Sequence, residues 1–374
     1  DGKGIATPLT YECIIRNLAE ASFDDMCCID GRVPYSAEVG VDPIIPGNSL
    51  ARFGDCLSLG TTQAPRVATT SQINKSLIHS AIYIPTMKPA YLRPVVIDGE
   101  KVDPMVKGLQ KVLGFQADIP LDILEIAAND VKQLLFKTVK GEKIVLDYAT
   151  AVRGKEGVYT SLNRRTSPGF PYSLNNPSSG KHHWFGDDET FIINKEIEAD
   201  VELILENARN KRRSDVIFIA SLKDERRPIA KVNAGKTRVF EAAPQHFVIA
   251  TRMYFLDFAA ALARDRIDNE IAVGTNVYSL DWDRIGKAMS LKGDRVIAGD
   301  FSNFDGSLSQ EILWSIVDII NYWYDGTVEE DNIRNMLFEE IVNANVMKPN
   351  GPTGENILQT HYQPSGNPLN VIIN

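Results

Sequence analysis

The spacing of apolar residues predicts helices and short strands in the middle of the chain. Apolar positions recur three and four residues apart in several segments, which is the pattern of a helix with one buried face. Shorter apolar runs between polar segments are typical of strands. Helices are therefore predicted at residues 121–137, 196–210 and 247–263, and extended segments at 216–222 and 237–242.

The remaining segments are less regular. Residues 1–64 contain one candidate helix, Tyr11–Ala21, beside a turn-rich stretch. Residues 66–110 are interrupted by several prolines and are expected to be extended and irregular. Prolines and glycines at 345–354 indicate a hairpin or loop. Mixed patterns of this kind favour an α+β fold.

One buried strand is predicted to end in a carboxylate. The run Arg295–Phe301 is largely apolar and contains Asp300 near its end. A helix is predicted directly afterwards, because Ser307 and Gln310 have the spacing of a capping box. Asp305 follows Asp300 by five residues and lies at the expected start of this helix.

Asp300 and Asp305 are the first candidates for chemistry. A carboxylate at the end of a buried strand is costly unless it binds a cation. Magnesium is a suitable cation, because it takes one or two carboxylates together with substrate phosphates and water. The same spacing also arises by chance among 49 acidic residues, and one acid is then a helix cap and the other a surface residue.

Charge is concentrated in one segment of the chain. The 374 residues carry a net charge of −9, which argues against a protein that coats nucleic acid without selectivity. Between Ala208 and Arg238, however, there are ten basic and three acidic residues, a net charge of +7. Such a segment suggests a channel or pocket for phosphates, and a solvated basic loop is the simpler alternative.

Composition bounds the class of protein. Hydrophobic residues make up 44% and charged residues 24%, as in ordinary globular proteins. No apolar run approaches the roughly 20 residues needed to cross a bilayer, and no signal peptide is expected from the first residues. The four cysteines form no C-x-x-C pair and are expected to be free thiols. Both ends of the chain are expected to be cuts within a longer polypeptide.

Two further segments add candidate residues. Thr166–Tyr172 is a rigid turn in which Gly169 would let a nucleic-acid backbone come close. Gln363–Asn374 combines a Ser-Gly turn with an apolar helix that carries Asn370 and Asn374. Buried asparagines must be hydrogen-bonded, so these two either fix a partner loop or bind a ligand hydroxyl.

Together and in this order, these segments resemble motifs of the RNA-dependent RNA polymerases of picorna-like positive-strand RNA viruses, especially of the dicistrovirus and marnavirus type. The resemblance covers roughly residues 65–374. In that family, the matching segments are motif G at Thr166–Tyr172, motif F at Lys223–Arg238, motif A at Asp300–Asp305 and motif B at Ser365–Asn374.

The resemblance implies a role for each candidate residue. Asp300 and the backbone carbonyl of Phe301 would hold Mg²⁺, or Mn²⁺ in its place. The residues that would recognise the ribose of the incoming NTP are Asp305, Ser365, Asn370 and Asn374. Those that would bind its triphosphate and base are Lys223, Arg227, Lys231, Lys236 and Arg238, and those on the template path are Thr166, Ser167, Gly169 and Gly366. Asn370 departs from the pattern, because many relatives carry Thr there.

The resemblance also implies a right-hand polymerase fold, which is α+β. The fingers would span residues 65–255 with an excursion at 337–361, and the palm 256–336 and 362–374. Residues 1–64 would form an N-terminal segment that is either the tail of a preceding chymotrypsin-like cysteine protease with a linker, or an unrelated linker. No motif C follows motif B in the chain, and the thumb is missing, so the fragment itself is expected to be inactive.

The implied reaction is template-directed RNA synthesis in viral genome replication, with two metal ions assisting transfer of a nucleotide from an NTP to an RNA 3′-hydroxyl. The implied partners are RNA template and primer, NTPs, a protein primer and other viral replication proteins. The implied location is the host-cell cytoplasm, at membrane-associated replication complexes. Two alternatives remain open: a reverse transcriptase-like polymerase, and a non-catalytic RNA-binding or scaffold module.

Overall fold

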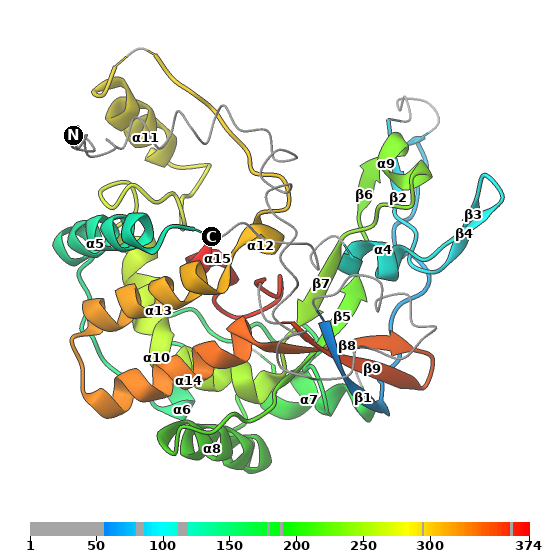
Figure 1. Cartoon of the computed structure of the whole chain (residues 1–374), viewed down its shortest axis with the longest axis horizontal. Helices are drawn as coiled ribbons and strands as arrows, with labels where there is room; N and C mark the ends of the chain where they lie inside the picture. The colour runs from blue at the N-terminus through cyan, green and yellow to red at the C-terminus, as the bar shows by residue number, and fades with distance from the viewer. Residues whose placement is uncertain are drawn as a thin grey trace, which may run out of the picture.

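A layer of helices packs beside a five-stranded sheet (Figure 1). The structure is a computed structural model that describes residues 56–79, 86–110, 119–177, 180–187, 190–293, 295–359 and 362–374. The candidate helix Tyr11–Ala21 and the proposed protease tail therefore lie outside the described residues.

The helical layer is centred on α10 (Gln245–Arg264). Three helices pack against α10, namely α6 (Tyr148–Arg153), α8 (Lys195–Arg209) and α14 (Val328–Val342), and α13 (Gln310–Tyr324) packs against α14 and α5 (Leu121–Thr138). The predicted helices at 121–137, 196–210 and 247–263 are confirmed to within two residues at each end.

Aromatic side chains fill the interior of this layer. Trp323 of α13 is buried, and its ring centre lies 5.1 Å from that of Phe258 in α10, edge to face. The indole Nε1 of Trp323 donates to the carbonyl of Val139 at 2.9 Å, which satisfies the only polar atom of that side chain. Burial of a large apolar side chain contributes roughly 1.5–3 kcal/mol, so this contact fixes the end of α5 against α13.

The sheet has the strand order β1-β9-β8-β5-β7. Its strands are β1 (Cys56–Gln63), β5 (Ile217–Leu222), β7 (Val239–Ala242), β8 (Ala344–Asn350) and β9 (Thr353–Gln359). β8 and β9 form an antiparallel hairpin, β8 runs parallel to β5, and β5 pairs antiparallel with β7. The predicted strands at 216–222 and 237–242 and the predicted hairpin at 345–354 are confirmed.

A smaller unit projects from the sheet (Figure 1). It contains the two-stranded sheet of β2 (Met87–Pro89) and β6 (Arg226–Pro228), the hairpin of β3 (Val95–Ile97) and β4 (Glu100–Val102), and the helices α4 (Pro104–Gln110) and α9 (Ile229–Asn233). Helix α4 corrects the expectation that residues 66–110 are extended throughout. Pro104 is tolerated because it occupies the first turn, and the Asp103 carboxylate accepts the Met105 N–H at 2.9 Å.

The predicted strand Arg295–Phe301 is wrong. The described residues of this segment form no strand and are exposed, with Ile297 88% and Phe301 67% accessible. A strand needs a neighbour for its backbone N–H and C=O groups, and no described segment pairs with this one. The apolar run alone was therefore not sufficient to form a strand.

The start of the following helix is also corrected. A short helix, α12 (Phe304–Ser307), comes first, and the Ser307 hydroxyl donates to the Phe304 carbonyl at 2.7 Å. The cap of α13 is Ser309, whose hydroxyl accepts the Ile312 N–H at 3.4 Å. The capping box predicted from Ser307 and Gln310 does not form, because the chain makes this extra turn first.

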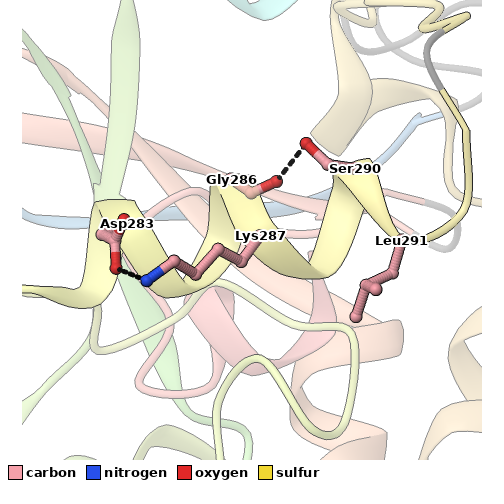
Figure 2. A pocket seen from close by; sticks show the side chains of 5 residues that line it. All are labelled: Asp283, Gly286, Lys287, Ser290 and Leu291. Atoms are coloured by element: carbon pink, nitrogen blue, oxygen red, sulfur yellow. Dashed lines mark hydrogen bonds and ion pairs between the residues drawn. The ribbon is translucent and has the colours of Figure 1, made fainter.

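Helix α11 (Asp281–Ser290) stands apart from the helical layer in Figure 1. It is tied to the end of α10 by Arg266, whose Nε and Nη2 donate to Asp281 at 3.0 and 2.7 Å. A surface hollow of about 620 Å³ lies along α11. Figure 2 shows the residues that line it, which are Asp283, Gly286, Lys287, Ser290 and Leu291. None of the predicted site residues lines this hollow.

Candidate functional site

Asp305 is the centre of a hydrogen-bond network that joins two distant segments. The Ser365 hydroxyl donates to Asp305 Oδ2, and Asn374 Nδ2 donates to Asp305 Oδ1 at 3.2 Å. Asp305 lies at the start of α12, and Asn374 follows the last helix, α15 (Asn370–Ile373). Of the four residues predicted to recognise a ribose, Ser365 and Asn374 are thus each hydrogen-bonded directly to Asp305.

Gln363 completes this network and was not among the predicted site residues. Its Nε2 donates to the side-chain oxygens of Asn374 at 2.6 Å and Asn370 at 2.8 Å, and lies 3.4 Å from Asp305 Oδ1. Its backbone N–H donates to the Asp305 carbonyl at 3.1 Å. Gln363 is 0% exposed. Sequence reasoning missed Gln363, because a glutamine directly before the Pro-Ser-Gly turn becomes a signal only once it is known to be buried and must find partners.

A buried glutamate lies under the Ser365 turn. Glu241 of β7 is 1% exposed, and its Oε2 accepts the Ser365 N–H at 2.9 Å. The phenol of Tyr362 is hydrogen-bonded to the same carboxylate. Burial raises the pKa of Glu241 from 4.5 to about 7, and the two hydrogen bonds only partly offset this. Sequence reasoning missed Glu241, because nothing in the pattern of β7 separates it from an ordinary strand residue.

Two glycine-bearing turns rest on the end of β7. A Cβ atom added at Gly366 would overlap the backbone oxygen of Glu241. A Cβ atom added at Gly169 would lie 2.5 Å from the Cα of Pro244 and 2.6 Å from the oxygen of Ala243, and Gly169 also has a left-handed φ of +73°. Gly169 and Gly366, both predicted on the template path, therefore pack against neighbouring backbone of residues 241–244.

The basic segment is folded around one acid. Glu225 forms a two-point ion pair with Arg238, and its oxygens lie 3.9 Å from Arg227 Nε and 4.0 Å from Lys223 Nζ. The hydrogen bond from Arg238 is the largest cause of the lowered pKa of Glu225, opposed by burial. Three predicted phosphate-binding cations thus share a single carboxylate, so positive charge remains in excess.

The backbone of this segment is held by the projecting unit. β6 pairs with β2, and the N–H of Ala90 donates to the carbonyl of Glu225 at 3.0 Å. Lys231 of α9 and Lys236 after it are exposed, and neither side chain has a hydrogen bond or ion pair with the described residues. They are available to a ligand.

Asp300 and Phe301 stand outside the network. Both are exposed, and the Asp300 carboxylate makes no hydrogen bond or ion pair within the described part of the chain. No group of three or more His, Cys, Asp or Glu side chains that would hold a metal occurs there either. One carboxylate with an adjacent main-chain oxygen is a donor set that suits Mg²⁺ when phosphates and water supply the other ligands.

Comparison with known proteins identifies the family of the chain. The family model described as viral RNA-dependent RNA polymerase matches residues 79–374. The chain belongs to this family.

Relatives of this polymerase chain include two viral proteins described as replicase polyproteins. That of Drosophila C virus (strain EB) is 39% identical over 398 residues, and that of cricket paralysis virus is 39% identical over 397. Each alignment covers 99% of this chain and 22% of the relative. The chain thus spans about a fifth of the length of these relatives.

A solved structure confirms the predicted right-hand polymerase fold. The Sicinivirus 3Dpol RNA-dependent RNA polymerase matches with a TM-score of 0.69 at 22% sequence identity. The match covers 83% of this chain and 63% of the other. The fold class, α+β, agrees with the helices and mixed sheet described above.

In this chain, the turn predicted as motif G is held by a buried lysine. The ammonium of Lys181 donates to the hydroxyl and, at 3.2 Å, to the carbonyl of Thr166. Lys181 is 4% exposed, and burial lowers its pKa to about 8. The Ser167 hydroxyl accepts the Gly169 N–H at 3.2 Å. Thr166 and Ser167 themselves are exposed, so the turn presents its surface to solvent.

A Gly-Asp-Asp sequence occurs at residues 186–188, upstream of motif F. Gly186 ends the short helix α7 (His182–Phe185), and Asp187 Oδ1 accepts the N–H and hydroxyl of Thr190 at 2.6 and 2.7 Å. Asp187 thus closes a local turn. Motif C of the family is also a Gly-Asp-Asp turn, but it follows motif B. The sequence at 186–188 precedes the segment predicted as motif A, so it does not have the place of a motif C.

Helix α10 bears on the expectation that no apolar run is long enough to cross a bilayer. By length and hydropathy, Gln245–Arg264 passes that test, and it is the one helix to do so within the described ranges. Its apolar window is 56% buried inside the molecule, which is typical of a core helix.

Proposed function

We propose that the chain forms the nucleotide-binding part of an enzyme that synthesises RNA on an RNA template during viral genome replication. The observation that carries this proposal is the network of Asp305, Ser365 and Asn374, assembled from motif A and motif B residues. It holds a carboxylate acceptor and an amide donor together, as recognition of a ribose 2′-hydroxyl requires.

The ribose of the incoming NTP would lie against Asp305 and the two asparagines. A hydroxyl both donates and accepts, so the carboxylate of Asp305 and an amide N–H can engage it at the same time. A 2′-deoxy sugar would leave these polar groups without a partner, and sites of this kind reject such analogues strongly. Asn370 takes part through its amide, which replaces the hydroxyl of the Thr found in many relatives.

The triphosphate would be bound by the basic segment. Lys231 and Lys236 are exposed and available, and Lys223, Arg227 and Arg238 share one acid. Arginine binds phosphate oxygens in pairs, and lysine acts as a point charge, so together they neutralise an extended polyphosphate. Arg238 is 58% exposed at its side chain, which leaves its planar group free to lie against a base.

Asp300 and the carbonyl of Phe301 would hold Mg²⁺. When bound, the metal would neutralise phosphate charge and activate the RNA 3′-hydroxyl. The residues of this chain then position the sugar and phosphates relative to that hydroxyl. A two-metal mechanism needs further carboxylates, so we expect the isolated 374 residues to incorporate no nucleotides.

The same proposal covers the wider setting of the polymerase. Residues 65–255 and 337–361 are assigned to the fingers, and 256–336 and 362–374 to the palm. The partners are RNA template, primer and other viral replication proteins, with a protein primer, at membrane-associated complexes in the host cytoplasm. Thr166, Ser167, Gly169 and Gly366 are assigned to the template path.

The test is an extension assay with the complete polymerase that contains this chain. An RNA primer on an RNA template is supplied with NTPs or with dNTPs. The reactions are then repeated with the primer on a DNA template. RNA-templated incorporation of NTPs supports the proposal. Preferential use of dNTPs indicates a reverse transcriptase-like enzyme, and RNA binding without any incorporation indicates a non-catalytic module.

A further inference from the structure

We propose that Gln363 sets the sugar selectivity of this site by fixing the direction of two asparagine amides. This inference rests on the proposed ribose recognition and adds a residue to it. Gln363 is a positioning residue: it is fully buried, and its described contacts are to the residues that would bind the sugar.

The argument begins with what an amide nitrogen can do. Nε2 of Gln363 carries two N–H groups and is a donor only. The two short contacts, 2.6 Å to Asn374 Oδ1 and 2.8 Å to Asn370 Oδ1, use both of them, and the 3.4 Å approach to Asp305 is the weakest. The opposite orientation of Gln363 would set its oxygen against two carbonyl oxygens, which is repulsive.

The direction of each asparagine follows from this contact. An asparagine side chain has an oxygen that accepts and an NH₂ group that donates, and rotation by 180° exchanges them. Because Gln363 binds both oxygens, both NH₂ groups point away from it. One of them, Asn374 Nδ2, donates to Asp305 Oδ1 at 3.2 Å. The other, on Asn370, has no partner among the described residues.

The site therefore offers donors from the asparagines beside an acceptor from Asp305. A ribose 2′-hydroxyl matches this arrangement, because its oxygen accepts from an amide and its hydrogen is donated to the carboxylate. If the asparagines were turned round, two carbonyl oxygens would lie beside a carboxylate. The hydroxyl has only one hydrogen to donate, so recognition would be lost.

The position of Gln363 is itself rigid. Its backbone N–H donates to the Asp305 carbonyl at 3.1 Å, and Pro364 follows it directly. Both the main chain and the side chain of Gln363 are thus joined to motif A. Since the side chain is excluded from solvent, water cannot readily replace the lost donor in a variant.

Two substitutions distinguish the effect of Gln363 on the orientation of the asparagine amides from the effect of its packing. Gln363→Glu keeps the shape but replaces the donor by an acceptor, so the asparagines are expected to turn their NH₂ groups towards it. Gln363→Met keeps the length and removes the donor, so the asparagines lose their fixed direction. We expect the preference for NTP over 2′-deoxy-NTP to fall about 30-fold in the first and about 5-fold in the second, within the range of one or two hydrogen bonds.

Gln245→Met is the matched control. Gln245 is also 0% exposed, and neither polar atom of its side chain has a hydrogen bond among the described residues. The same change of a buried glutamine there is expected to alter stability without altering the NTP to 2′-deoxy-NTP ratio.

The experiment measures kpol/Kd for an NTP and its 2′-deoxy analogue in single-turnover extension by the complete polymerase, with a melting temperature for each variant. A reduced ratio in the Gln363 variants, but not in Gln245→Met, supports the inference. An unchanged ratio in Gln363→Met overturns it, even if Gln363→Glu fails to fold. A wild-type enzyme that incorporates no NTP would instead overturn the proposed function, and this inference with it.

Discussion

Asp300 and Asp305 are five residues apart, yet their surroundings are opposite. Asp305 is bonded by Ser365 and Asn374 and lies over a buried glutamine. Asp300 lies in an exposed segment without regular structure and without a bonding partner in the described ranges. Gly366, which lies near Asp305, packs against the backbone of Glu241. A Cβ atom added at Gly299, next to Asp300, would meet no other atom within 4 Å.

The difference shows what each half of motif A needs in order to fold. The half that contains Asp305, which we propose to bind the sugar, is completed by the Ser365 turn, Asn374 and β7, so its hydrogen bonds close on one another. The half that contains Asp300, which we propose to bind a metal ion, has no strand neighbour and no cluster of further ligands among the described residues. One motif can therefore be organised at one end and open at the other.

The largest expected effect comes from Asp300. We expect Asp300→Ala to lower nucleotide incorporation by the complete polymerase about 10³-fold or more, because metal-bound transition states lose several kcal/mol without their carboxylate. The melting temperature should stay unchanged, since an exposed side chain without partners contributes little stability. Primer extension and thermal unfolding are the measurements.

Asp283→Ala is the control for this change. Asp283 is an aspartate with a 54% exposed side chain, in a surface ion pair with Lys287 (Figure 2). Its removal should leave both activity and stability nearly unchanged. Normal extension by Asp300→Ala would show that the metal site lies elsewhere.

The second effect is the pH dependence of the free energy of unfolding that Glu241 causes in the packed region. The pKa of Glu241 is about 7 when folded and near 4.5 when unfolded, so between these pH values the folded state keeps a proton that the unfolded state has lost. The stability contributed by this proton is present below pH 4.5 and is lost as the pH rises to 7, and a pKa difference of about 2.5 corresponds to roughly 3 kcal/mol in total. Urea unfolding at pH 5 and pH 7.5 measures it.

Glu241→Gln should remove this dependence and keep an acceptor for the Ser365 N–H. Glu311→Gln, at an exposed position of α13, should leave the dependence in place. An equal pH slope in wild type and Glu241→Gln would mean that another group is responsible.

The third effect compares the two glycines directly. Gly366→Ala should destabilise the protein by about 1–3 kcal/mol, because the new methyl group meets the backbone of Glu241, which cannot rotate away. Gly299→Ala should change stability by less than about 0.5 kcal/mol, because the space around it is open. Denaturant unfolding of both variants decides this, and equal losses would contradict the contrast drawn between the two regions.

The smallest effect concerns Asn374. We expect Asn374→Ala to reduce the preference for NTP over 2′-deoxy-NTP about tenfold, which is the value of one hydrogen bond of roughly 1.4 kcal/mol. The turnover of NTP itself should change less. Competition between the two nucleotides in primer extension measures the ratio. A loss of turnover without loss of preference would assign Asn374 to packing.

Sequence reasoning gave the periodic elements correctly. The helices α5, α8 and α10 have a clear apolar face, and the β8–β9 hairpin has its turn residues between two strands. It failed at Arg295–Phe301, where an apolar run has no pairing partner among the described residues, and at Ser307, where a turn displaced the helix start. The first error concerns a missing long-range partner, and the second concerns a local turn that takes the place of the predicted capping box.

The candidate site shows the same limit. Asp305, Ser365 and Asn374 were predicted through the order of motifs, and the structure places them in one network. Gln363 and Glu241 were missed, because their importance comes from tertiary contacts rather than from residue type or spacing. A glutamine and a strand glutamate become informative only when burial shows that they need partners.

The four residues of β7 support both the segment proposed to bind the nucleotide and the turn proposed to bind the template. The strand begins directly after Arg238, supports Gly366 through Glu241, and is followed by the backbone on which Gly169 rests. Arg238, which we propose to bind the triphosphate, is thus joined through β7 to both turns. Under the proposed function, a substitution that shifts β7 is expected to change sugar choice and template placement together.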